Sequence, residues 1–198
     1  MTFRLPDGIV PNGCDPFLVD FGVTLTPYGG GPTQRVNRLG LRLGAKFTIP
    51  PTVYAGKGMA LISRLVQAKT DRLIIEWPQP DFDPGAVGTP LVRVNVTGGT
   101  TLQLKGLPAG KTLLEGQMLS FEKDRNYAHM FAAPATADGS GNVAASVWPP
   151  MRVALSVNDP VEIAEPVIEG NVLPGEELSW NIAVERLVNV SFSVVEGK

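Results

Sequence analysis

Cysteine and histidine are almost missing from this chain of 198 residues, which contains one of each, Cys14 and His129. One cysteine cannot form a disulfide within the chain, and a structural zinc site needs three or four Cys, His or carboxylate ligands. A Ser-His-Asp or Cys-His catalytic site could use only His129, and the sequence has no G-x-S-x-G motif. We therefore expect no cofactor, no bound metal and no enzymatic activity, and we expect His129 to be structural.

One catalytic class stays open on the residues alone, a glycosidase that uses two carboxylates. Asp81 with Asp83, and Glu176 with Glu177, are close pairs of acids, but both pairs lie in turn-like segments. The sequence therefore singles out no pair of acids as catalytic.

Long apolar runs and excess positive charge are also lacking. No stretch of about 18 apolar residues occurs, and the N-terminal MTFRLPDGIVPNG has no apolar core of the kind found in secretion signals. Charged residues make up 18% of the chain, the net charge is −2 and the isoelectric point is about 5.5. Because apolar stretches of this kind are missing, we expect no membrane association. Because an acidic protein binds nucleic-acid phosphates poorly, we also expect no sequence-specific nucleic-acid binding.

Glycine and proline are abundant, with 22 and 18 residues that separate many short apolar runs. This spacing is typical of a mainly β protein. Residues 41–49 alternate apolar and polar side chains, which indicates a half-buried strand. One segment, residues 54–70, has helical periodicity. Ala55, Met59, Ile62 and Val66 share one face, and Leu61 and Leu65 widen this apolar stripe, which we predict to be buried.

The order of these patterns predicts two domains. The C-terminal stretch alternates again through residues 188–194, and a terminal strand needs a sheet to join. We therefore predict a split β-sandwich with one flanking helix, built from residues 1–85 and 177–198. Residues 86–176, with many short β segments and turns, form an inserted small β-barrel. The three tryptophans, Trp77, Trp148 and Trp180, are interpreted as core residues.

The stretch GLPAGKT at residues 106–112 has some features of a nucleotide-binding loop. That loop requires four residues between its two glycines and a helix after its Lys-Thr. Here Gly106 and Gly110 enclose three residues, Pro108 has no N–H to donate, and a strand-like segment follows. We interpret the stretch as a turn between strands, with Lys111 in solvent.

A calcium loop is a second possibility, because Asp138, Ser140 and Asn142 have the alternating oxygen spacing of such loops. The glycine and glutamate that the loop also requires are replaced by Val143 and Pro149. A hairpin turn explains the segment without a metal.

Most of the chain, about residues 20–195, resembles distal-tail proteins of long-tailed bacteriophages. The resemblance lies in the order of small motifs, which are GGGPTQRVNRLGLRLGAKFTIPP, RLIIEWPQPDF, LKGLPAGKTLLEGQMLSF, NYAHMFAAPATADGSGNVAASVWPPMR and DPVEIAEP. It implies a tail-tube-like sandwich, with a second β-domain on a ring, often a hexamer, in the virion tail. Such rings assemble in the host cytoplasm and join the tail tube protein to the baseplate hub or other minor tail proteins.

The charge pattern is compatible with such a ring. Residues 1–50 carry five basic and three acidic groups, whereas residues 155–198 carry two basic and eight acidic groups. These are either two solvated faces or complementary surfaces of neighbouring copies. We predict that Arg35, Arg38 and Arg42 lie at a subunit interface. The alternative function is a carbohydrate- or receptor-binding β-module of a tail fibre.

Overall fold

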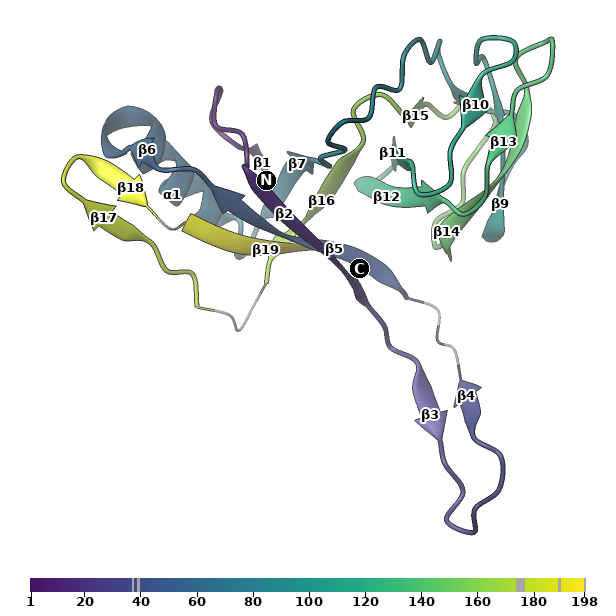
Figure 1. Ribbon diagram of the computed structural model, residues 1–198, viewed down its shortest axis with the longest axis horizontal. Helices are drawn as coiled ribbons and strands as arrows, with labels where there is room; N and C mark the ends of the chain where they lie inside the picture. The colour runs from purple at the N-terminus through teal and green to yellow at the C-terminus, as the bar shows by residue number, and fades with distance from the viewer. Residues whose placement is uncertain (37, 39, 174–176, 189, 198) are drawn as a thin grey trace.

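The computed structural model describes the chain except for residues 37, 39, 174–176, 189 and 198. The protein is mainly β, as predicted, and has one α-helix in the described residues, α1 (Met59–Gln67). Two six-stranded sheets form the body, each with its own apolar core, and a long hairpin leaves the body at one side (Figure 1).

The first sheet has the strand order β1-β7-β16-β19-β5-β2. β1 pairs with β7 in parallel, and the other neighbours are antiparallel. The C-terminal strand pairs with the alternating strand of the N-terminal half, so that Phe192 lies opposite Phe47 in the core. The strands are β1 (Thr2–Arg4), β2 (Gly13–Val19), β5 (Arg42–Ile49), β7 (Arg72–Glu76), β16 (Val167–Val172) and β19 (Val190–Glu196).

The helix is shorter than predicted, and it buries one side of the predicted apolar stripe. Residues 54–58 form a separate turn, η1 (Tyr54–Gly58), in which Gly56 has φ of +76°. In α1, Leu61 and Leu65 are fully buried against the first sheet, whereas Met59 and Val66 are exposed. The apolar stripe is broad, and the sequence period alone could not decide which side of it meets the sheet.

The second sheet has the order β15-β11-β12-β14-β9-β8 and is nearly closed into a barrel. Its two ends meet through backbone hydrogen bonds, from Val161 N to Pro90 O at 3.0 Å and from Val92 N to Asp159 O at 2.9 Å. Apolar side chains fill the interior. The strands are β8 (Leu91–Val92), β9 (Gly99–Lys105), β11 (Met118–Glu122), β12 (Asn126–Phe131), β14 (Val143–Met151) and β15 (Val161–Glu162), beside a small pair, β10 (Thr112–Leu113) and β13 (Ala135–Thr136).

The barrel is inserted between β7 and β16, and its C-terminal boundary differs from the predicted one. Residues 167–172 were assigned to the barrel, but β16 pairs with β7 and β19 and therefore belongs to the first sheet. The sequence of β16, VIEGNV, has no pattern that identifies its partner strands.

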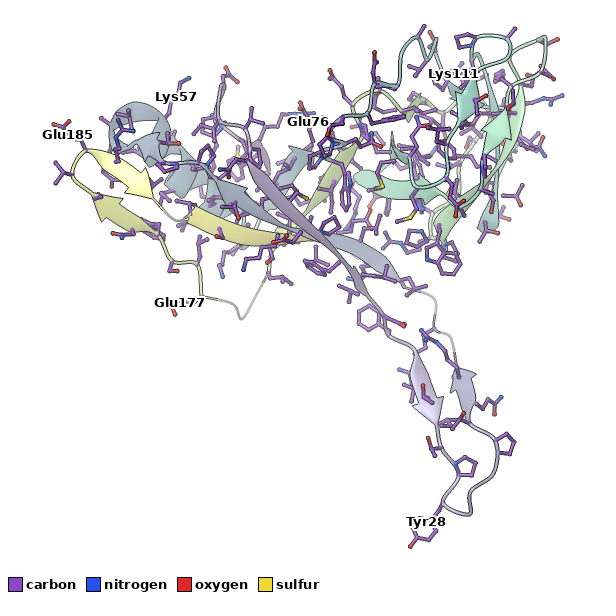
Figure 2. All side chains as sticks on the ribbon, viewed as in Figure 1. Tyr28, Lys57, Glu76, Lys111, Glu177 and Glu185 are labelled. Atoms are coloured by element: carbon purple, nitrogen blue, oxygen red, sulfur yellow. The ribbon has the colours of Figure 1, made fainter. Side chains whose placement is uncertain are left out.

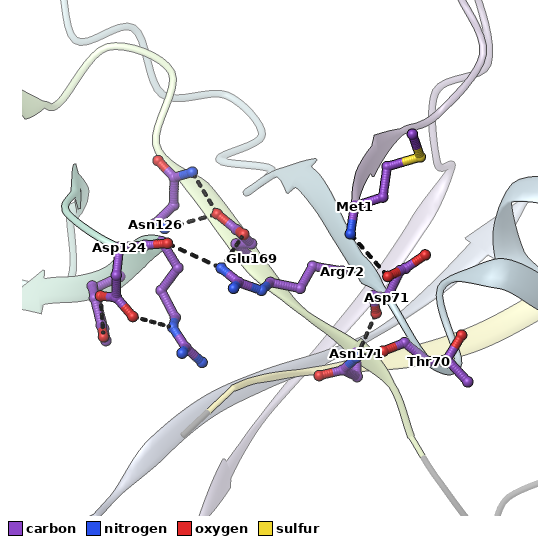
Figure 3. A network of polar contacts seen from close by, with 10 residues as sticks. Met1, Thr70, Asp71, Arg72, Asp124, Asn126, Glu169 and Asn171 are labelled. Carbon is purple, nitrogen blue, oxygen red and sulfur yellow. Dashed lines mark hydrogen bonds and ion pairs between the residues drawn. The ribbon is translucent and has the colours of Figure 1, made fainter.

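A buried carboxylate joins the two sheets at this boundary. Glu169 on β16 accepts hydrogen bonds from the backbone and side-chain nitrogens of Asn126 on β12, both at 2.8 Å. Its other oxygen lies 3.2 Å from Arg72 Nη1, which also donates to the backbone carbonyl of Asp124 at 3.0 Å (Figure 3). Because Glu169 is buried, these bonds fix the barrel on the first sheet.

Two smaller sheets project from the body. One consists of β6 (Thr52–Val53), β17 (Asn181–Ala183) and β18 (Arg186–Val188), beside α1. The other is a hairpin of β3 (Val23–Leu25) and β4 (Gln34–Val36). We call this hairpin, with its connecting turn and the flanking residues 20–22, 38 and 40, the arm (Figure 1).

Candidate binding surfaces of the arm and its base

The arm exposes apolar side chains along its length. Val23, Leu25 and Val36 on its two strands are exposed, and Tyr28 is fully exposed at its tip (Figure 2). A two-stranded hairpin is marginally stable alone in water, and exposed apolar groups at this density mark interaction surfaces. The arm is therefore suited to pack against another molecule.

A cleft of about 430 Å³ lies where the base of the arm faces β14 of the barrel. Three arginines and one aspartate supply its charged groups, and the apolar lining includes Trp148. The lining residues are Leu18, Asp20, Arg35, Arg38, Gly40, Leu41, Trp148, Pro150 and Arg152.

Two of the three arginines in the cleft have partners. Arg35 forms an ion pair with Asp20, whose other oxygen accepts a hydrogen bond from Gly22 N at 2.7 Å. Arg152 Nη2 lies 2.5 Å from the buried carboxylate of Glu196. Arg38 is exposed and makes no ion pair with a carboxylate of the described residues.

The three arginines predicted at an interface are therefore placed near one another. Arg35 and Arg38 line the cleft, and Arg42, at the start of β5, has its guanidinium 5.2 Å from the centre of the Phe21 ring. The pKa of Arg42 is lowered, first by burial and then by the positive charge of Arg152. Positive charge is thus concentrated at the base of the arm. Sequence reasoning missed the contribution of Arg152, which comes from the barrel.

Two tryptophans were wrongly interpreted as core residues. Trp77 is buried, but Trp148 is 41% exposed and Trp180 is 38% exposed. The alternation along β14 could have identified Trp148, because Val147 points into the barrel and the next side chain must therefore point out.

His129 is fully buried, in agreement with a structural role. Its ring stacks on Phe121, with centroids 5.2 Å apart, and its Nδ1 lies 2.8 Å from the carbonyl oxygen of Pro149. Burial lowers the pKa of His129 to about 4. The neutral imidazole is therefore the form that the barrel holds at neutral pH.

The two loop motifs are turns. Lys111 is half-buried rather than fully solvated as predicted, and its Nζ donates a hydrogen bond to the carbonyl of Pro84. Asp138 Oδ1 accepts hydrogen bonds from the backbone nitrogens of Ser140 and Asn142, at 2.8 and 2.9 Å. Across the described parts of the chain, no group of three His, Cys, Asp or Glu side chains could hold a metal ion.

None of the helices in the described residues is long and apolar enough to cross a membrane. In comparisons with known proteins, no protein-family model and no curated protein matches this chain.

Proposed function

We propose that this chain is a structural protein of the tail tip of a long-tailed bacteriophage and assembles as a ring. In this proposal the first sheet with α1 is a tail-tube-like sandwich that forms the ring. The inserted barrel lies on the ring, and the partners are the tail tube protein and the baseplate hub or other minor tail proteins. The order of the sequence motifs and the mainly β fold support it.

The arm is the observation that carries the proposal. It extends away from both cores and exposes Leu25 and Val36, which would be costly to leave in water in a monomer (Figure 2). A neighbouring subunit that covers the arm would bury these side chains and stabilise the two-stranded hairpin. An assembly that repeats this contact gives each arm a partner.

The edges of the first sheet offer a second contact. β1 and β2 are its terminal strands, so that each presents backbone N–H and C=O groups on its outer side. Pairing of one edge with the other edge of a neighbour is a head-to-tail contact. Such a contact closes into a ring when the rotation between subunits permits.

The proposal is tested by removing the apolar character of the arm. The triple variant Val23→Ser, Leu25→Ser and Val36→Ser changes exposed side chains, and the matched control Val94→Ser changes an exposed valine of the barrel segment. In analytical ultracentrifugation, the wild type and V94S should sediment as a ring-sized particle and the triple variant as a monomer. Ring formation by the triple variant at wild-type concentrations would contradict the role of the arm.

A further inference from the structure

The cleft at the base of the arm combines positive charge with an exposed indole. Arg35, Arg38 and Arg152 face a single lining carboxylate, Asp20. Trp148 lies on the barrel wall of the same cleft and is 41% exposed. Exposure of an apolar indole surface to water is unfavourable in free energy, and a bound molecule would remove it. Both features would be satisfied by one bound molecule that has an anionic group and an apolar face.

The excess of positive charge indicates an anion. Asp20 is already paired with Arg35, and Glu196 approaches Arg152 from the buried side of the cleft. Arg38 has no carboxylate partner within the described part of the chain. Guanidinium groups bind carboxylates and phosphates through paired, charge-assisted hydrogen bonds. Crowding with Arg152 also contributes to the lowered pKa of the nearby Arg42, and an anion would relieve this repulsion.

The apolar wall of the cleft indicates a sugar rather than a peptide strand. Trp148 is followed by Pro149 and Pro150, which have no N–H groups, so that this end of β14 is poorly suited to strand addition. Recognition on this wall must therefore come from side chains. A sugar ring has an apolar C–H face for the indole and hydroxyl groups around its rim, and a cleft of about 430 Å³ lies within the range of small-ligand sites.

We propose that this cleft binds an acidic saccharide, with a sugar ring on Trp148 and its carboxylate or phosphate group at Arg38. Arg35 and Arg152 add positive potential around the anion while they keep their own carboxylate partners. This binding activity goes beyond ring formation. Because Arg38 is also predicted to lie at a subunit interface, a neighbouring subunit could cover the cleft, so that each titration is made with the wild type and with the arm variant Val23→Ser, Leu25→Ser and Val36→Ser, which is expected to be monomeric and changes no residue of the cleft lining.

The test is calorimetric titration of the full chain with tetragalacturonate, compared with neutral galactotetraose, inorganic phosphate and tetraglutamate. We expect a dissociation constant below about 1 mM for tetragalacturonate and binding at least about tenfold weaker for the other three probes. Added salt should weaken the binding of tetragalacturonate. Equal binding of the neutral sugar would overturn the role of the anion. Equal binding of phosphate would show an anion site without sugar recognition, and equal binding of tetraglutamate would show a peptide site, and either result would overturn the proposal.

Variants locate the site. Arg38→Gln should weaken tetragalacturonate binding about tenfold, because the side chain is exposed and its loss should not affect folding. The matched control Arg186→Gln removes an exposed arginine of β18 and should leave the affinity unchanged. Trp148→Ala should weaken binding by a similar factor, with its melting temperature measured in parallel. Wild-type affinity in R38Q, or equal losses in R38Q and R186Q, would overturn the proposal.

Discussion

The carboxylate of Glu196 holds the barrel on the first sheet, with its Oε1 2.6 Å from the backbone nitrogen of Ala128. Glu196 belongs to β19 and is 1% exposed, whereas Ala128 belongs to β12 of the barrel. On this side of β12, β14 pairs with Met130 and Phe131. At Ala128, the Glu196 carboxylate accepts the backbone hydrogen bond that a neighbouring strand would otherwise accept. Glu169 does the same at Asn126. Two side chains of the first sheet thus complete the hydrogen bonding of a barrel strand.

The first prediction concerns the stability that Glu196 provides. Glu196→Ala would leave the N–H of Ala128 and the guanidinium of Arg152 without their acceptor, in a site from which water is excluded. We expect a loss of about 3–5 kcal/mol in the free energy of unfolding, measured by urea denaturation. The control Glu177→Ala, at an exposed position, should change it by less than about 0.5 kcal/mol. A similar small change in both variants would contradict this account of the junction.

The second prediction concerns acid. Because burial lowers the pKa of His129 to about 4, the folded protein favours the neutral ring, whereas the unfolded chain takes up a proton near pH 6.5. The stability from this difference is fully present above pH 6.5 and is lost as the pH falls toward 4. By pH 5 the loss should be about 2 kcal/mol. The pKa of Glu196 is raised by burial, which gives the opposite slope, so that the measurement must compare variants.

The comparison is between the wild type and His129→Gln, whose unfolding free energies are measured from pH 7 to pH 4.5. Glutamine does not titrate, so that the variant should lose less stability than the wild type across this range. Parallel curves for the two proteins would show that His129 does not contribute to the acid sensitivity.

A third prediction follows from close packing between β16 and β19. A Cβ atom at Gly170 would lie 1.9 Å from the carbonyl oxygen of Val195, which is part of the backbone and cannot rotate away. Gly170→Ala should therefore destabilise the protein by about 1–3 kcal/mol or more. Gly139 has no atom within 4 Å of such a Cβ, and Gly139→Ala is the matched control. Thermal unfolding compares the two, and equal melting temperatures would be evidence against this packing.

The fourth prediction separates assembly from folding. Arg38→Glu reverses an exposed charge at the base of the arm, where neighbouring subunits are proposed to meet. We expect it to reduce ring formation in size-exclusion chromatography while the melting temperature stays within about 2 °C of the wild type. If the melting temperature and ring formation fall together, Arg38 supports the monomer rather than the interface.

Sequence patterns identified the strands better than their partners. The alternation in residues 41–49 is local, and it predicted β5 with its buried face. The assignment of β16 to the barrel was wrong because a strand with both faces buried shows no partner in its pattern. In α1 the predicted apolar stripe was broad, and contact with the sheet buried the side of it that carries Leu61 and Leu65.

The candidate site was predicted in part. Arg35 and Arg38 were selected from a basic segment, and the structure places both in one cleft. Arg152 and Trp148 complete that cleft from the inserted barrel, so that their proximity depends on how the barrel sits on the first sheet. That placement depends on buried bonds from Glu169 and Glu196, which have no local signature in the sequence.

Native mass spectrometry of the wild-type chain over a range of concentrations tests the central claim most directly. The account predicts a closed oligomer of one defined size, with a hexamer as the expected ring, which persists on dilution to low micromolar concentration. A chain that remains strictly monomeric at the highest concentration would contradict it.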